Sequence, residues 1–184
     1  MTYSATMHAL DHQDPRDIRR RSGDAHAPRL AANRELSFRP EEFFVGRTVG
    51  GGAVRNPFGR IVRRCYITTE GRSSAGLGSI QFQETFAYDD GELDVWRWAM
   101  TAGRDGHYVA AEESAGSGIS GQHRDGDYVL EFRRPQGKAQ GLIAPHFATR
   151  FTLLAPDMAM KHVRISVLGA PVATLSAVHR RVDD

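Results

Sequence analysis

The chain has 184 residues, of which 40% are hydrophobic and 25% charged, and its formal net charge at pH 7 is +2. This length and composition fit one folded domain with a tail. Basic and acidic residues are interspersed, so the sequence shows no basic stripe for phosphate backbones or anionic lipid, and we expect no nucleic-acid partner. Cys65 is the only cysteine, which excludes an internal disulfide framework and a cysteine-based metal site.

Residues 1–33 mix charged and small residues with few apolar ones. Such a segment cannot bury enough surface to offset its ordering entropy, so the sequence predicts a flexible tail followed by one domain over residues 34–184. No stretch approaches the roughly 20 apolar residues of a membrane span, and the N-terminus lacks the apolar core of a signal peptide. We therefore expect a cytoplasmic protein, or an envelope-associated one if the true start site differs.

A short helical turn is predicted between Phe38 and Phe44. Pro40 suits a first helical position, two acidic residues follow it in the first turn, and Gly46 lies just beyond the end. We expect the phenylalanines of this segment to plug one end of the fold.

Short segments of alternating apolar and polar residues follow, separated by Gly, Pro and Asp-Gly. They cover residues 47–54, 60–69, 79–88, 93–101, 107–113, a weak segment from 119 or 120, then 128–133, 147–154, 161–168 and 172–180. Helical patterns of ten residues are absent from the sequence, which argues against βαβ units. The sequence predicts an all-β fold: an antiparallel up-and-down, lipocalin-like (calycin-type) barrel of about eight to ten strands that encloses an interior.

The stretch from Ser79 to Trp98 predicts a β-hairpin with a carboxylate on its apolar face. Ile80, Phe82, Phe86 and Tyr88 share one face by the period of two, and Glu84 lies on that face. If Asp90-Gly91 forms a two-residue turn, Tyr88 lies opposite Leu93, Phe86 opposite Val95 and Glu84 opposite Arg97. If Asp89 joins the turn and Gly91 forms a bulge, the register shifts by one residue and Trp96 faces Glu84.

Several of these motifs resemble a bacterial family called domain of unknown function 3833, over about residues 36–180. The similar motifs are Phe43-Phe44-Val45-Gly46, Gly50-Gly51-Gly52, the hairpin segment Glu84 to Gly91, Trp98, Gly106-His107-Tyr108 and the glycine series from Gly116 to Gly121. The Phe-Phe-x-Gly start and the Phe-x-Tyr-Asp-Asp-Gly hairpin are the more specific of them. The resemblance implies a lipocalin-like barrel without an established activity, and many relatives look like envelope lipoproteins.

Other motifs predict no chemistry. The G-x-G-x-x-G pattern from Gly116 to Gly121 is followed by a turn and a strand, whereas a dinucleotide site needs a helix there. His146, His162 and His179 could converge inside a barrel, but their spacing is not that of a metal site and no haem motif accompanies them. No nucleophile elbow or reactive-cysteine signature is present. We therefore expect no cofactor and no metal.

Three hypotheses for function follow. The first is a barrel that binds a small apolar, lipid-like or fatty-acid-like ligand, whose polar head meets Glu84 and Arg97 and whose body lies against Phe82, Phe86, Tyr88, Trp96 and Trp98. The second is a structural or assembly factor of the envelope with a filled barrel and an exposed apolar patch. The third is an enzyme that uses Glu84 and Arg97, although a neighbouring guanidinium makes a carboxylate a weak base. The ligand and the oligomeric state stay open.

Overall fold

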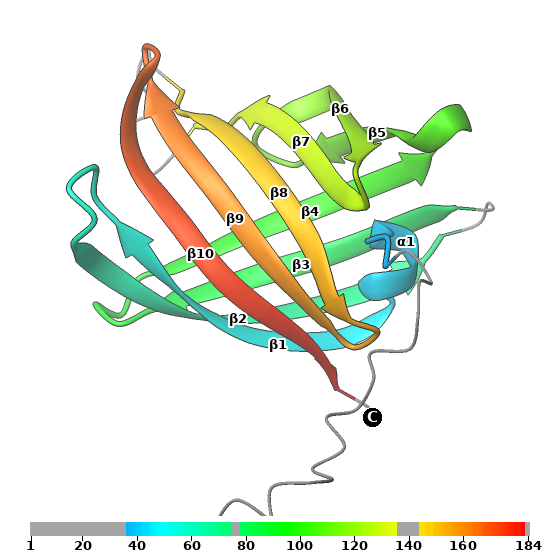
Figure 1. Cartoon of the computed structure of the whole chain (residues 1–184), viewed down its shortest axis with the longest axis horizontal. Helices are drawn as coiled ribbons and strands as arrows, with labels where there is room; N and C mark the ends of the chain where they lie inside the picture. The colour runs from blue at the N-terminus through cyan, green and yellow to red at the C-terminus, as the bar shows by residue number, and fades with distance from the viewer. Residues whose placement is uncertain (1–35, 75–77, 136–143, 183–184) are drawn as a thin grey trace, which may run out of the picture. The chain divides into compact units, whose positions relative to one another are not determined.

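Ten antiparallel strands close into one barrel in the computed structural model (Figure 1). The structure describes residues 36–74, 78–135 and 144–182. The predicted tail, residues 1–33, lies outside the described residues. The described elements are α1 (Pro40–Phe43), β1 (Gly46–Arg55), β2 (Ile61–Ser73), β3 (Ser79–Tyr88), β4 (Leu93–Ala102), the 3₁₀ turn η2 (Arg104–Gly106), β5 (His107–Glu112), β6 (Gly116–Arg124), β7 (Asp127–Arg133), β8 (His146–Ala155), β9 (Met158–Val167) and β10 (Ala170–Val182).

Each strand pairs with its neighbours in sequence, and β1 closes the barrel by pairing with β10, where Arg47 lies opposite Val182. The prediction of an up-and-down antiparallel barrel is confirmed, including the weak segment that becomes β6. Residues 116–121, which carry the G-x-G-x-x-G pattern, belong to this strand. Gly116 and Gly118 take φ values of 88° and 81°, so these glycines shape an irregular strand.

The short helix α1 closes one end of the barrel. It begins with Pro40 in the first position, as predicted, and its phenylalanines are buried. The ring of Phe44 stacks on Phe82 with centroids 4.5 Å apart, and Phe38 stacks on Phe151 at 4.9 Å. Gly71 on β2 allows this approach, because a Cβ there would collide with the Phe44 carbonyl oxygen. We call this end of the barrel the α1 end.

The opposite end, which we call the distal rim, carries the turns between β1 and β2, β3 and β4, β5 and β6, and β9 and β10. These turns cover residues 56–60, 89–92, 113–115 and 168–169. Half-buried apolar residues such as Val54, Tyr88 and Ile165 lie on the inner side of the strands that lead to this rim.

Side chains fill the barrel. Inward-facing aromatic residues from α1, β3, β4, β5, β7 and β8 form one continuous core. Among the described residues, the cavity detected in this core has a volume of only about 10 Å³. The binding hypothesis predicted a continuous apolar cavity, and the cavity that the described residues form at the core is far smaller than a fatty acid.

Candidate functional site

A buried ion pair joins β3 to β9 across the barrel interior. Lys161 Nζ donates to both carboxylate oxygens of Glu84 at 2.8 Å, and the two side chains are 2% and 1% exposed. Glu84 follows Phe82 and precedes Phe86 on the inner face of β3, as the alternation predicted. Lys161 occupies the corresponding inner position of β9, between the buried residues Ala159 and Val163.

The hairpin takes the second of the two registers, in which Glu84 lies opposite Trp96. Gly91 adopts a φ of 85°, and the Tyr88 amide donates to the Glu92 carbonyl, so Asp89 is part of a longer turn. The prediction that Glu84 lies opposite Arg97 is therefore wrong, as are the pairs Tyr88–Leu93 and Phe86–Val95 of that register.

Arg97 faces outward, because the register shift moves it to the other face of β4. Its side chain is 56% exposed and binds Glu113 and Gln83 on the outer surface. There it borders a wide concavity of about 800 Å³ whose other lining residues include Arg47, Glu70 and Arg72. Inside the barrel, the ion-pair partner of Glu84 is therefore Lys161 and not the predicted Arg97.

Four of the five aromatic residues predicted for the site lie around the ion pair: Phe82, Phe86, Trp96 and Trp98. Lys161 Nζ lies 5.0 Å from the ring centroid of Phe86, 5.2 Å from Trp96 and 5.3 Å from Phe151, which are cation–π distances. Phe82 and Trp98 are also buried in the interior. Tyr88 is half-buried toward the distal rim, and burial raises its pKa to about 12.

The 10 Å³ cavity lies against this ion pair. Its lining residues are Phe82, Glu84, Trp96, Trp98, Met100, Leu130, Thr149, Phe151 and Lys161. Trp98 Nε1 and Thr149 Oγ1 have no hydrogen-bond partner among the described residues. An ammonium has three donors, and Glu84 takes two of the donors of Lys161. Three lining side chains therefore offer polar atoms for one more partner, and the volume suits a single water or one head-group atom.

His179 on β10 is a further buried polar residue of the interior. It is fully buried between the rings of Phe44 and Phe151, and neither ring nitrogen has a partner among the described residues. Burial lowers its pKa from 6.5 to about 4, partly opposed by the charge of Glu84. The imidazole is therefore neutral near pH 7.

A second charged cluster lies near the distal rim. The Arg134 guanidinium donates to Asp94 at 3.1 and 3.4 Å and lies 3.2 Å from Glu112 Oε2, while the Asp94 carboxylate accepts from Trp96 Nε1 at 2.7 Å. Glu112 is buried and also accepts from the amides of Ser114 and Ala115. This cluster was not predicted from the sequence, although the alternation Tyr108, Ala110, Glu112 on β5 places the carboxylate on the inner face.

A hydrogen-bonded chain fastens α1 to the barrel wall. Tyr108 donates to Glu41 at 2.9 Å, and His123 Nε2 lies 3.1 Å from the Tyr108 hydroxyl. The Phe38 amide donates to the Gly126 carbonyl at 3.0 Å. Burial and the hydrogen bond to Glu41 raise the pKa of Tyr108, and burial lowers the pKa of His123. Tyr108 therefore stays a donor, and the chain holds α1 in place.

His146, His162 and His179, which could have converged inside the barrel, do not converge. His146 and His162 face outward, where they lie beside Glu131 and Ser176, and only His179 faces the interior. No group of three or more potential metal ligands occurs among the residues that the structure describes. Cys65 is buried, and burial raises the pKa of its thiol.

Comparison with known proteins shows the family and the fold. The model of a family described as a protein of unknown function, DUF3833, matches residues 22–181, and the chain belongs to this family. A search of curated proteins found no match. The structure is similar to an S-type phycobiliprotein lyase, CPES, from Guillardia theta, with a TM-score of 0.60 at 14% identity over 82% of this chain and 96% of that chain. It is also similar to Rv2717c from M. tuberculosis, with a TM-score of 0.52 at 17% identity over 76% and 93% of the two chains.

Proposed function

We propose that this DUF3833 protein binds a small amphipathic molecule inside its barrel, with the polar head beside Lys161. The observation that carries the proposal is the cavity at the ion pair, where Lys161, Thr149 and Trp98 offer polar atoms to a partner that the described protein residues do not supply. Buried polar groups normally have hydrogen-bond partners, so two partnerless atoms, Trp98 Nε1 and Thr149 Oγ1, on residues that line one cavity support an occupant.

The chemistry of the lining defines the ligand class. Lys161 and Trp98 are donors, and Thr149 can donate or accept, so a carbonyl, a hydroxyl or a protonated carboxyl head fits this position. An ionised carboxylate would add a second buried negative charge beside Glu84. The neighbouring rings of Phe82, Trp96 and Phe151 favour an apolar or aromatic body. A body longer than a few atoms requires these rings to turn aside, since the cavity beside the ion pair has a volume of only about 10 Å³. One of the structurally similar proteins is a phycobiliprotein lyase, and a barrel of this kind suits a small-ligand role.

Thr149→Val tests the proposal, because it removes one hydroxyl at nearly constant volume. Thr149 Oγ1 makes no hydrogen bond to the described residues, so the free energy of unfolding should fall by less than about 1 kcal/mol. Affinity for a fluorescent fatty acid should fall about tenfold if the hydroxyl contacts the head group. Thr69→Val is the matched control, since Thr69 is also buried without a partner but does not line the cavity.

Native mass spectrometry of the full chain from its own cells identifies the ligand directly. A stoichiometric small molecule in the organic extract supports the proposal. An empty protein that also fails to bind a panel of fluorescent fatty acids refutes it.

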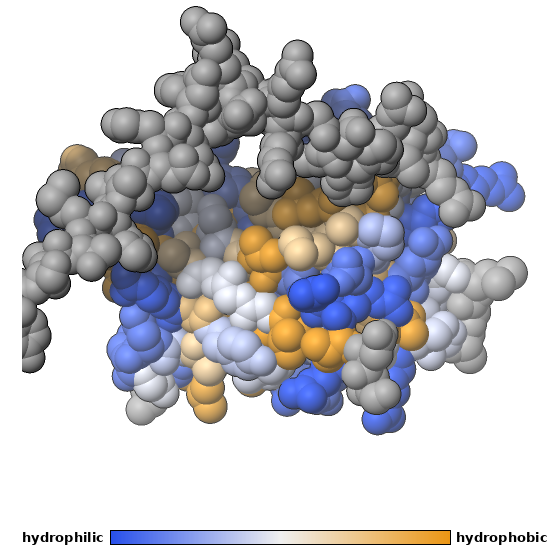
Figure 2. All heavy atoms as spheres, turned by 60° about the horizontal axis from the view of Figure 1, so that its bottom comes forward, coloured by the Kyte–Doolittle hydropathy of each residue, from blue (hydrophilic) through white to orange (hydrophobic). Residues whose placement is uncertain are grey.

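The filled interior favours a second candidate, a structural or assembly role in which the barrel never opens. The outer surface offers apolar residues for such a role: Tyr66 on β2 and Val178 on β10 lie on either side of Gly51, and Met160 follows Val178 on β9. They are 53%, 41% and 39% exposed. Figure 2, which turns the lower side of Figure 1 toward the viewer, shows hydrophobic surface directly beside hydrophilic surface. Thr149→Val distinguishes the two candidate functions. A purely structural barrel binds no ligand, so the substitution has no ligand affinity to lower.

A further inference from the structure

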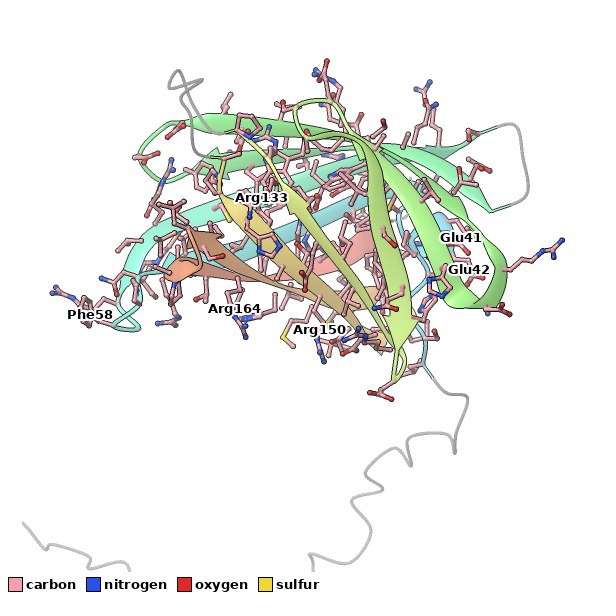
Figure 3. All side chains as sticks on the ribbon, turned by 90° about the horizontal axis from the view of Figure 1, so that it is seen from above. Glu41, Glu42, Phe58, Arg133, Arg150 and Arg164 are labelled. Carbon is pink, nitrogen blue, oxygen red and sulfur yellow. The ribbon has the colours of Figure 1, made fainter. Side chains whose placement is uncertain are left out.

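The distal rim projects large apolar side chains into solvent from two neighbouring hairpins. Phe58, at the tip between β1 and β2, is 88% exposed, and Leu168, at the tip between β9 and β10, is 79% exposed. The hairpins are neighbours because β1 pairs with β10. Leu93, in the first position of β4 on the same rim, is 66% exposed. Figure 3 shows Phe58 pointing away from the barrel at one end and Glu41 and Glu42 of α1 at the other.

The turn of Phe58 is braced in this conformation. Asn56 Oδ1 accepts from the amides of Phe58 and Arg60 at 3.1 Å, and the Gly59 amide donates to the Asn56 carbonyl at 2.9 Å. Arg55 Nη1 donates to the Gly59 carbonyl at 2.9 Å. The exposure of Phe58 is therefore a property of a hydrogen-bonded turn.

Leu168 occupies an unfavourable backbone position for its residue type. Its φ is 51° and that of Gly169 is 82°, so both central residues of the turn are left-handed. Two-residue hairpin turns of this kind favour Asn, Asp or Gly in the first position, and a leucine there is strained. Folding alone would favour a small polar residue, because the leucine side chain is also exposed to water. Strain combined with an exposed apolar side chain indicates a binding role.

Positive charge lies close behind these tips. Arg55 and Arg60 flank Phe58 in the sequence, and Arg164 lies on the outer face of β9, four residues before Leu168. All three arginines are exposed, and none forms an ion pair with a residue that the structure describes. The carboxylates of the neighbouring turn, Asp90 and Glu92, are already paired with Arg63.

The described turns of the α1 end lack such apolar tips. They carry Arg104-Asp105-Gly106, Asp125-Gly126 and Pro156-Asp157, without a large apolar residue at a tip. The composition of the sequence showed no basic stripe, because the arginines of the distal rim come from segments far apart in the chain and are brought together by the closure of the barrel. Among the described residues the two ends therefore differ in their apolar tips, whereas exposed arginines without an ion pair occur at both ends, with Arg47, Arg72 and Arg104 at the α1 end.

We propose that the distal rim docks on an anionic lipid bilayer, with Phe58 and Leu168 inserted among the acyl chains and Arg55, Arg60 and Arg164 at the phosphates. Separate projecting tips suit a deformable lipid surface, whereas a stable protein interface requires a continuous complementary face of about 800 Å² on each partner. Inserted apolar side chains combined with arginines at the head groups are the usual means of interfacial binding. The inference goes beyond the proposed ligand binding and does not depend on it.

Co-sedimentation of the full chain with vesicles tests the proposal. We expect binding to vesicles of equimolar phosphatidylcholine and phosphatidylglycerol, and much weaker binding to phosphatidylcholine alone. Phe58→Ser combined with Leu168→Asn should weaken binding at least about tenfold, because burial of each apolar side chain is lost while asparagine suits the left-handed turn. Arg60→Gln combined with Arg164→Gln should weaken it by about tenfold or more. Leu154→Ser is the control, because Leu154 is 45% exposed on β8 near the α1 end.

Insertion has its own readout. A tryptophan introduced by Phe58→Trp should be quenched by brominated acyl chains, beyond any quenching of Trp96 and Trp98 in the unmodified protein. Absence of vesicle binding, equal binding by the rim variants and the control, or equal binding to neutral vesicles overturns the proposal. The two proposals fail separately: an empty barrel that binds vesicles refutes only the ligand, and a loaded barrel that ignores vesicles refutes only the docking.

Discussion

Lys161 and Glu84 are separated by 77 positions in the sequence, yet Nζ lies 2.8 Å from both carboxylate oxygens in the middle of the barrel. Among the described residues, each charge is compensated by the other and by the surrounding rings. Removal of either one leaves a buried charge without a counter-ion, whereas removal of both leaves none. This coupling makes the pair the most informative target for mutation.

We expect Glu84→Gln and Lys161→Met each to lower the free energy of unfolding by about 3–5 kcal/mol. The double variant should be nearly as stable as the unmodified protein, because its interior contains no uncompensated charge. Urea unfolding of the four proteins measures the coupling. Additive losses in the double variant would contradict a coupled pair.

The pH dependence of stability should report His179. Its folded pKa of about 4 lies below the value of 6.5 for an unperturbed histidine. Below pH 6.5 the unfolded chain therefore binds a proton that the folded protein does not. The contribution of neutral His179 to the free energy of unfolding is fully present above pH 6.5. It is lost as the pH falls toward 4, and the loss is at most roughly 3 kcal/mol.

His179→Leu should reduce the change in the free energy of unfolding between pH 4 and pH 7. The measurement compares this change in the variant with the change in the unmodified protein. His123, whose pKa burial also lowers, retains a slope of the same sign. His162→Gln is the control, because His162 lies on the outer surface beside Ser176. An unchanged slope in His179→Leu would show that the imidazole is accessible to protons in the folded protein.

Gly71→Ala should destabilise the α1 end. The new Cβ collides with the Phe44 carbonyl oxygen, so either the helix or the strand has to move. We expect a loss of about 2–3 kcal/mol and faster hydrogen exchange of the Phe44 amide, which donates to the Pro40 carbonyl. Gly51→Ala on β1 should be nearly neutral, since the nearest atom to its Cβ is 3.7 Å away.

Arg97→Gln should change stability by no more than about 0.5 kcal/mol and leave ligand affinity unaltered, because the exposed pair with Glu113 is screened by solvent. Arg134→Gln is the comparison, with a loss of several kcal/mol expected from its buried contact with Glu112. Urea unfolding and ligand titration of both variants decide between the two hairpin registers. A loss of ligand binding in Arg97→Gln would favour the register with Arg97 inside.

The strands could be predicted because alternation of apolar and polar residues survives along almost every one of them, and the turns carry Gly and Asp-Gly. The hairpin register could not be fixed, because Asp89-Asp90-Gly91 fits two turn lengths that differ by one residue. That single residue decides whether Arg97 lies inside or outside the barrel.

Lys161 was missed because the predicted strand began at that residue, where a lysine looks like an exposed end. The strand in fact begins at Met158. Ala159, Lys161 and Val163 then share the inner face, and the period of two was the available signal. Its pairing with Glu84 was beyond sequence reasoning, because the contact spans the barrel between strands that are not hydrogen-bonded to each other.

Closure of the barrel through β1 and β10 has a consequence for biosynthesis. β1 emerges from the ribosome first, yet one of its two edges finds no partner until β10 has been made. During that interval β1 and the most recently made strand expose unpaired backbone groups, which are a template for association with other chains. Gly50 and Gly52 lie on that waiting edge of β1, directly against β10 in the folded barrel. Because glycine has a low strand propensity, the unpaired edge of β1 is a poor template for association with other chains. Because glycine has no side chain, β10 can then pack closely against this edge.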